Sequence, residues 1–543
     1  MKKLESLFEN KIFLWCVIVA TTIFGAIYYY GIVNSFAING EEVFWVYNRF
    51  LEEKISLLHN FYFTNDIIYL ITSFIAYMIS GFSLETVRIG WTLRYALILL
   101  LTVIIVVKCG KSKYEGICTL PIVVILMIEM AKISYKSDFG FIDAGQDVLT
   151  NYPSNYHATA LIVSLLCTFL MYKIVEEKNR NTKTALIVLL LSISIYYIKL
   201  GDIILFADFI IPLMLYGLFK IFYNEKYRIH LNIATFVALG FLIITKVLNG
   251  TSIHNLLWSS AYTSEYNTGI YGNTSWANVF NITSNIDNLF KLIVGLFNLD
   301  RHDMTIVSVW SIVLAVRIVL VITGFVLAVR IIISNVSNKM DERGYDVVDC
   351  LCAYGLLILC AAKLLTTFNY HNNYNRYFFS MVPLLTIIVT RNARNVINSI
   401  CSIKKIDSFQ SKLIGLVIGT LIMILGINNV YAGEKIDSDT ESIQQCIDYI
   451  VDNGEGYAIA PVHIYARMAA QAGPEHVIFF FDINEMHKWV GDNVKPRYCI
   501  SNYDEGLNQV YRTYYETEQE MIDAYGKPIK KLEFGNIHLY QFW

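Results

Sequence analysis

The sequence predicts an all-α polytopic membrane protein with about eleven transmembrane helices, followed by a small C-terminal α/β domain. Three observations predict this fold class. The 543 residues are 55% hydrophobic and only 16% charged, a balance that soluble globular domains do not have. Apolar runs of about 15 to 28 residues recur along the chain, as membrane-crossing helices require. Residues 434–543 hold 18 acidic and 9 basic side chains, whereas the preceding part is basic.

The apolar runs define the predicted spans. The first run follows three lysines and has no small-residue cleavage site after it, so we interpret it as a retained signal-anchor helix. The predicted spans cover residues 12–33, 91–107, 117–131, 157–175, 184–199, 203–222, 230–247, 306–333, 347–367, 377–390 and 413–432.

The connections between the spans alternate in charge, and this alternation predicts the topology. Five connections are short and basic, and the positive-inside rule assigns them to the cytoplasm together with the N-terminus. The other connections and the C-terminal domain then lie on the extracytoplasmic face of a bacterial inner (plasma) membrane. The basic connections are 108–116, 176–184, 220–228, 330–343 and 391–412.

One further apolar run, Ile67–Ser80, decides whether this topology closes. It is shorter than the about 20 residues that a helix needs to cross the bilayer. The stretch before it, residues 43–63, mixes aromatic and charged side chains, as helices in the headgroup plane do. We therefore predict two juxtamembrane helices in the first external loop. A later connection, 248–305, is rich in Asn, Thr, Ser and Tyr and is interpreted as a long irregular external loop.

The predicted domain boundary separates a transmembrane domain (1–433) from an extracytoplasmic α/β domain (434–543). The pattern of the second domain predicts a helix, three strands and a final hairpin around Gly535-Asn536. Its only cysteines, Cys446 and Cys499, leave a disulfide open. The predicted elements are the helix 437–453, the strands 457–460, 477–481 and 497–501, and the hairpin strands 530–534 and 537–542.

Carboxylates of the first two external loops are the candidate catalytic residues. Glu41 and Glu42 follow the first span, where a carboxylate can act as a general base or bind a divalent cation. A solvated acidic loop has the same composition. In the second loop, three aspartates precede a histidine that opens the next span, which leaves a Mg²⁺ or Mn²⁺ site open beside ordinary loop acids. These residues are Asp138, Asp143, Asp147 and His157.

Cationic and aromatic residues at two other external junctions are the candidate phosphate-binding residues. Lys199 can neutralise a lipid phosphate or pair with Asp202 at a tight turn. Arg376 offers a planar charged fork that suits phosphate, with His371 and Tyr377 beside it. An aromatic-belt anchor at the lipid headgroups is the alternative for this cluster.

External carboxylates and external cations suit one kind of chemistry, the transfer of a sugar from a lipid phosphate carrier. The cations stabilise the leaving phosphate while the carboxylate activates the acceptor. The sequence has no GxGxxG, P-loop or HExxH motif and no nucleic-acid-binding module. It therefore gives no support for nucleotide-fed cytoplasmic chemistry, zinc proteolysis or nucleic-acid binding.

In their order along the chain, these residues resemble the GT-C membrane glycosyltransferases, which include protein O-mannosyltransferases and aminoarabinose transferases. The resemblance implies a polyprenyl-phosphate-sugar donor and a first-loop carboxylate as the base. Glu41 is the positional match, although the family more often has Asp there. The features that carry the resemblance are Glu41-Glu42, Ile68-Tyr69-Leu70 through Gly81-Phe82 to Arg88, Lys199, and Arg376-Tyr377 with Pro383.

We therefore expect a glycosyltransferase in which Glu41 or Glu42 is the base and Asp143 or Asp147 assists. The expected substrate-binding residues are Lys199, His371, Arg376 and Tyr377, and the acceptor can be a glycan, lipid or protein. Two alternatives remain, a transporter or flippase of a lipid-linked glycan and a non-enzymatic envelope protein. A transporter predicts broken helices with many polar residues at mid-membrane. The charges within spans are few: Glu129, Asp208, Lys246, Arg317 and Lys363.

Overall fold

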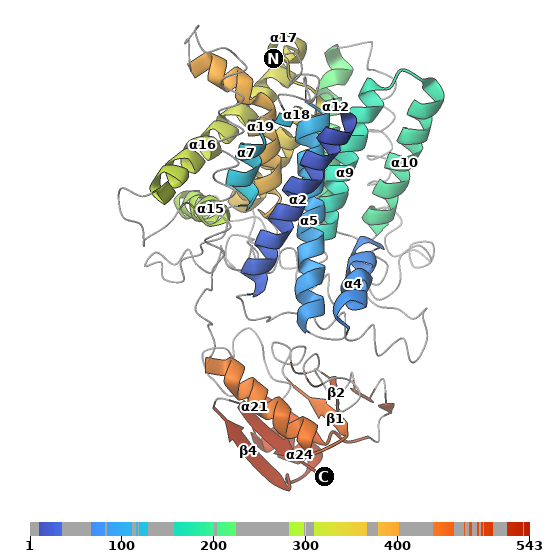
Figure 1. Cartoon of the computed structure of the whole chain (residues 1–543), viewed down its shortest axis with the longest axis vertical. Helices are drawn as coiled ribbons and strands as arrows, with labels where there is room; N and C mark the ends of the chain where they lie inside the picture. The colour runs from blue at the N-terminus through green and yellow to red at the C-terminus, as the bar shows by residue number, and fades with distance from the viewer. Residues whose placement is uncertain are drawn as a thin grey trace. The chain divides into compact units, whose positions relative to one another are not determined.

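The structure, a computed structural model, is mostly helical and has a small five-stranded sheet near its C-terminus (Figure 1). The chain forms two compact units; one holds most of the helices and the other holds the sheet. The structure describes residues 10–34, 67–81, 84–110, 116–117, 119–128, 157–199, 203–223, 282–297, 299, 309–365, 378–400, 438–460, 468, 472, 477–480, 486–487, 490–491, 494–502, 518–535 and 537–543.

Five of the described helices are long and apolar enough to cross a membrane, as expected of a membrane-embedded protein. Each of the five overlaps a predicted span. Two other predicted spans, 230–247 and 413–432, lie outside the described residues, so the number eleven stays a prediction. The five helices are α2 (Lys11–Asn34), α5 (Leu84–Lys108), α9 (His157–Glu176), α16 (Val309–Val336) and α18 (Val347–Leu365).

Two other predicted spans contain short π-helices. The sequence pattern predicts continuous α-helices there, so the π-helical turns are a departure from it. Such turns loosen the regular backbone ladder and occur often at functional positions. The first interrupted span consists of α7 (Leu120–Val123) and η1 (Val124–Ile128), and the second of α11 (Ile203–Leu205), η2 (Phe206–Ile210) and α12 (Ile211–Tyr223).

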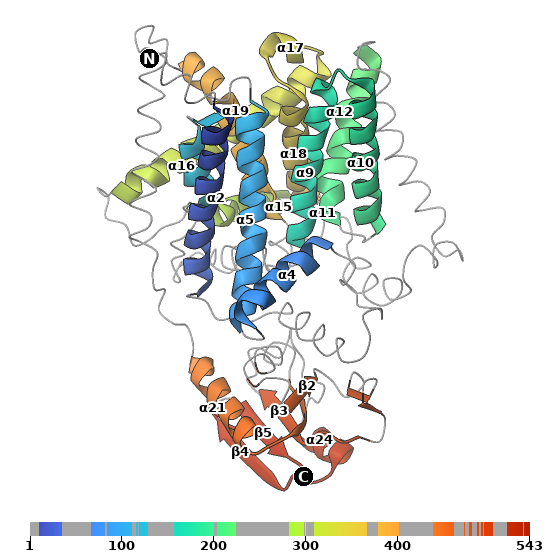
Figure 2. The ribbon, with the colours of Figure 1, turned by 45° about the vertical axis from the view of Figure 1, so that its right-hand side comes forward.

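Helix α18 is the centre of the helical unit and packs against α9, α12, α16 and α19 (Met381–Ile400) (Figure 2). Glycines allow these helices to approach closely. A Cβ atom on Gly324 of α16 would lie 2.6 Å from Leu385 Cγ of α19, and one on Gly355 of α18 would lie 2.9 Å from Leu384 Cδ1. Real Cβ atoms do not come this near to other atoms, so the two helix contacts depend on glycine.

The first turn of α18 explains where that helix begins. Asp346 Oδ1 accepts hydrogen bonds from the backbone N–H groups of Val348 (2.9 Å) and Asp349 (3.2 Å). Asp349 Oδ2 in turn accepts the N–H of Asp346 at 3.1 Å. This reciprocal arrangement is a capping box, and it satisfies backbone donors that the helix itself leaves without partners.

Helix α4 (Ile67–Ser80) matches the short apolar run that the sequence predicts to lie along the membrane surface. Tyr69, Thr72 and Ala76 are buried and repeat at helical spacing. The rest of the helix exposes large apolar side chains, a stripe that suits contact with lipid. These exposed side chains belong to Ile67, Ile71, Phe74, Ile75, Met78 and Ile79.

Two sequence-based interpretations need correction. The connection 248–305, interpreted as irregular, contains the amphipathic helix α15 (Ile282–Leu296), which packs against α18. The connection 391–412, interpreted as a basic loop from its first residue, begins instead as the second half of α19, which continues to Ile400. In both cases polar residues give a helical segment the composition of a loop.

The C-terminal sheet has the strand order β2-β1-β3-β5-β4. The strands β2, β1 and β3 are parallel, whereas β3, β5 and β4 pair antiparallel. This architecture confirms the predicted small α/β fold and its final hairpin. The elements are α21 (Ser438–Asp452), β1 (Gly456–Ile459), β2 (Val477–Phe480), β3 (Tyr498–Asn502), α24 (Glu518–Tyr525), β4 (Lys530–Phe534) and β5 (Ile537–Gln541).

Helices cover both faces of this sheet. On one face, Cys499 and Tyr540 lie in a core cluster with Met521 of α24. On the other face, Tyr449 of α21 donates a hydrogen bond to Gln541 Oε1 at 3.0 Å. Because residue 541 and residue 540 point to opposite faces of β5, α21 and α24 lie on opposite sides. Cys446 of α21 is accordingly separated from Cys499 by the sheet, and both are free thiols.

Candidate functional site

The predicted site residues lie almost entirely outside the part of the chain that the structure describes. Two of them are described as helix ends only: α9 begins at His157 and α10 (Arg180–Lys199) ends at Lys199. The site can therefore be built only from the helices that lead to it. The predicted residues outside the described ranges are Glu41, Glu42, Asp138, Asp143, Asp147, His371, Arg376 and Tyr377.

Two pairs of neighbouring helices in the helical unit, α2 with α5 and α9 with α10, run in opposite directions (Figure 2). Lys108 Nζ, at the end of α5, lies 4.7 Å from the centre of the Trp15 ring near the start of α2. Helices α9 and α10 pack together and are joined by the short turn 177–179. In Figure 2 the end of α5, the end of α9 and the short helix α17 (Met340–Arg343) all lie at the upper end of this unit.

The charges near Cys109 show which helix ends meet there. Burial raises the pKa of the Cys109 thiol to about 12, and the charges of Arg391 and Lys173 act in the opposite direction. Asp346 and Glu176 act on the same thiol and raise its pKa. Helix α18 starts directly after α17, and Arg391 in the middle of α19 pairs with Asp346 and Asp349 at that start, so these segments lie at the same end as the ends of α5 and α9 in Figure 2. The helix ends gathered here adjoin four of the predicted basic connections, and we name this the basic end.

The other end of the helical unit collects the helix termini next to the predicted site. Helix α9 starts there at His157, and its antiparallel neighbour α10 ends there at Lys199. Helix α18 also ends there, at Leu365, because its start lies at the basic end. Phe378, which follows the predicted Arg376-Tyr377 pair directly, lies beside the last turns of α18. We name this the site end.

A buried lysine lies at the site end. Lys363 is 3% exposed, and its Nζ lies 5.5 Å from the centre of the Phe378 ring. The next residue, Leu364, accepts a hydrogen bond through its carbonyl oxygen from Asn285 Nδ2 of α15 at 3.1 Å. A lysine so far from solvent is costly unless an aromatic face or an anion stabilises it. From the sequence, Lys363 is only a charge within a predicted span, with no connection to Arg376.

Two more buried charges lie within the helical unit. Arg94 of α5 is 2% exposed, and its guanidinium carbon lies 4.6 Å from the centre of the Tyr69 ring. Asp208, in the π-helix η2, is also buried, and its backbone faces Gly355 of α18. Arg94 is not among the charges singled out from the sequence, although a lone arginine early in an apolar run is the signal that marks it.

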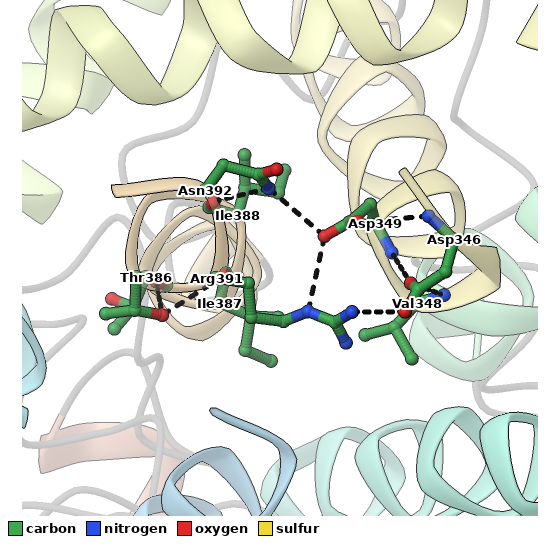
Figure 3. A network of polar contacts seen from close by, with 9 residues as sticks. Asp346, Val348, Asp349, Thr386, Ile387, Ile388, Arg391 and Asn392 are labelled. Atoms are coloured by element: carbon green, nitrogen blue, oxygen red, sulfur yellow. Dashed lines mark hydrogen bonds and ion pairs between the residues drawn. The ribbon is translucent and has the colours of Figure 1, made fainter. Parts of the chain in front are cut away.

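The fullest polar network among the described residues lies at the basic end (Figure 3). The Arg391 guanidinium of α19 forms ion pairs with Asp346 and Asp349, and its Nε lies 3.3 Å from Asp349 Oδ1. Asn392 Nδ2 donates to the same oxygen at 3.1 Å. The two carboxylates offset the charge of one guanidinium and join two helices, which suits a structural lock. The sequence pattern places Arg391 in a basic connection between spans, and the burial of its side chain within α19 corrects that interpretation.

No group of three or more His, Cys, Asp or Glu side chains suited to a metal ion is present within the described ranges. The metal site predicted at Asp138, Asp143 and His157 falls on residues whose side chains lie outside them. In chemical terms, the described part of the site end offers a buried ammonium beside an aromatic ring, an arrangement that suits an anionic ligand. The chain matches no protein-family model, and no curated protein matches it.

Proposed function

We propose that the protein is a GT-C-like membrane glycosyltransferase with about eleven spans that transfers a sugar from a polyprenyl-phosphate donor on the extracytoplasmic face. The observation that carries the proposal is the gathering at one end of His157, Lys199 and the helix terminus that follows Arg376-Tyr377. The described helix ends that adjoin four of the basic connections lie at the opposite end, which supports a cytoplasmic N-terminus and an external site.

The buried Lys363 supports an anionic donor. Phosphate-linked sugars carry negative charge at the position where the glycosidic bond breaks, and cations nearby stabilise the leaving phosphate. Lys363 is a third cation of the proposed site beside Lys199 and Arg376, which the sequence assigns to the same membrane face. Its Nζ lies beside the ring of Phe378, and Phe378 is two residues after Arg376 in sequence.

In the proposed reaction, the carboxylate of Glu41 or Glu42 removes a proton from the acceptor hydroxyl. The acceptor oxygen then attacks the anomeric carbon, and the sugar–phosphate bond breaks as negative charge develops on the carrier phosphate. Asp143 or Asp147 assists the base or holds a divalent cation. Lys199, His371, Arg376 and Tyr377 hold the donor headgroup.

A transfer assay with the full chain in lipid nanodiscs tests the proposal. The protein is incubated with radiolabelled polyprenyl-phosphate sugars and candidate acceptors, and the Glu41→Gln/Glu42→Gln double variant is compared with it. Loss of a general base lowers turnover by about 10²–10⁴-fold. Glu342→Gln, an exposed carboxylate of α17 at the basic end, serves as the matched control. Full transfer by the double variant would sink the assignment of the base.

A transporter or flippase of a lipid-linked glycan is the second candidate, and the two π-helices favour it. Transporters use interrupted helices and buried charges near mid-membrane, and η1, η2 and Asp208 have these properties. Proteoliposomes loaded with a fluorescent lipid-linked glycan separate the two functions. Movement of the label between leaflets without a new glycosidic bond supports the transporter and contradicts the transferase.

A further inference from the structure

One side chain can hold two segments of the helical unit when it donates hydrogen bonds to the backbone of both. The two segments are the π-helix η1, described as far as Ile128, and the end of α15 at Leu296. Buried carbonyl groups without a hydrogen bond are costly in a membrane. The residues that donate hydrogen bonds to these two segments therefore decide how firmly each segment is held.

One arginine donates hydrogen bonds to both segments. Arg317 of α16 is 2% exposed, and its Nε and Nη2 atoms donate to the Ile125 carbonyl oxygen at 3.1 and 2.8 Å. Its Nη1 atom donates to the Phe297 carbonyl oxygen at 3.4 Å. The planar guanidinium fork reaches two carbonyl groups from separate segments at once, which a lysine ammonium on a single flexible stem does less well.

A second side chain donates a hydrogen bond to only the first of these segments, η1. The hydroxyl group of Tyr95, from α5, donates to the Met127 carbonyl oxygen at 2.5 Å. Tyr95 is itself fixed by the stacked Tyr29 ring, whose centre lies 4.2 Å away. Carbonyl oxygens carry partial negative charge, so a cation that donates to two of them is stabilised by both. The arrangement explains why Arg317 is tolerated within an apolar helix.

The two segments lead into the connections that carry the proposed chemistry. Residues 129–156, which follow η1 directly, contain the second-loop aspartates, and α15 belongs to the long connection 248–305. We infer that Arg317 is a positioning residue that fixes η1 and α15 against α16 and so sets where both connections leave the helical unit. The role of these connections in catalysis rests on the proposed function; the fixing of the two segments does not.

Hydrogen exchange of the full chain in nanodiscs tests the inference without any activity measurement. In Arg317→Met, which keeps length but loses charge and donors, amides of 120–128 and of 282–297 are expected to exchange about ten- to a hundredfold faster. Arg317→Lys is expected to lie between that variant and the native chain. Arg330→Met, an exposed arginine of the same helix, leaves both segments unchanged. Unchanged exchange in either segment of Arg317→Met overturns the inference.

Tyr95→Phe gives an independent arm if Arg317→Met does not assemble. It removes the hydroxyl donor of η1 only, so exchange should rise in 120–128 and not in 282–297. In that arm, Arg317→Lys must accelerate exchange in both segments for the inference to stand. The inference is contradicted if Tyr95→Phe and Arg317→Lys change the hydrogen exchange of the two segments in the same way.

Transfer kinetics separate this inference from the proposed function. If the chain transfers sugar, Arg317→Met should lower kcat by about tenfold or more while the donor KM stays within about twofold, because it displaces reacting groups. Arg317→Lys should restore part of kcat. Faster exchange in a chain that shows no transfer activity leaves the inference standing and removes the proposed function. If the native chain transfers sugar but Arg317→Met exchanges at the native rate, the inference is removed and the proposed function stands.

Discussion

Arg391 Nε lies 3.3 Å from Asp349 Oδ1, and the two side chains are only 5% and 3% exposed. The same carboxylate takes part in the capping box of α18, so one residue begins that helix and ties it to α19. Asp346, the other ion-pair partner of Arg391, is 37% exposed. The two carboxylates thus differ in how far they depend on the arginine for stabilisation of their charge.

Asp349→Leu should destabilise the protein by about 3–5 kcal/mol, because it removes a buried partner and leaves the arginine charge less well offset. Asp346→Asn should cost about 1 kcal/mol, since water screens the more exposed carboxylate. Thermal unfolding in detergent measures both changes. The double variant Asp349→Leu/Arg391→Met should recover most of the loss; equal instability of the single and double variants would contradict a pairwise contribution.

Gly324→Ala should destabilise the protein by about 1–3 kcal/mol, because the added Cβ would lie 2.6 Å from Leu385 Cγ and push α16 away from α19. Leu385→Ala in the same chain should restore much of this loss by making room. Gly81→Ala is a poor control, since its φ of +65° strains any other residue. Ala328→Gly, on the same helix, controls for helix propensity. Unfolding midpoints in detergent measure these effects, and a Gly324→Ala variant of native stability would exclude the close contact.

The cysteines of the C-terminal sheet unit should react slowly with iodoacetamide in the folded chain. Burial raises the pKa of the Cys446 and Cys499 thiols from 9.0 to about 12. Because the folded state keeps the thiols neutral, their contribution to stability is complete below pH 9 and is lost as the pH rises from 9 toward 12. Labelling followed by mass spectrometry should give a rate that rises about tenfold per pH unit between 8 and 11. A plateau near pH 9, the value for the unfolded chain, would show that labelling occurs through unfolding instead.

Helix α4 should contact lipid through its exposed stripe. Phe74 and Met78 are 60% and 68% exposed, whereas Thr72 and Ala76 on the other face are buried. A carbene reagent dissolved in the bilayer should therefore label Phe74 and Met78 and spare Thr72. Labelling that is equal on both faces, or absent from α4, would contradict a helix that lies along the membrane surface.

Apolar run length was sufficient to predict most helices, because burial in lipid requires an unbroken apolar segment of a set length. It also predicted α4 from Ile67 to Ser80, and the turn residues Gly535-Asn536 predicted the final hairpin. Helix α15 was missed because Asn285, Asp287 and Lys291 give it a loop-like composition. Its apolar residues nevertheless recur at helical spacing, and the helix packs on α18, which is remote in sequence.

The candidate site was harder to predict than the fold. Arg391 follows an apolar run, so its charge indicates a membrane boundary, and nothing near it in sequence reveals Asp349 as a partner. Lys363 can be connected with the predicted site only when the structure shows Phe378 beside it. Pairs of this kind depend on how antiparallel helices align, and apolar periodicity does not determine that alignment. The sequence did indicate that His157 and Lys199 belong to one side, and their helix termini agree with it.

Lys363→Met should weaken binding of undecaprenyl phosphate by about ten- to a hundredfold, since it removes a buried cation from the proposed phosphate site. The unfolding temperature of each variant is measured in parallel, so that affinities are compared only between variants that remain folded. Lys339→Met, an exposed lysine at the basic end, should bind like the native chain. Thermophoresis in nanodiscs with and without the lipid measures these affinities. Native affinity in Lys363→Met would separate this lysine from the donor, and the support that it gives to an anionic substrate would then be lost.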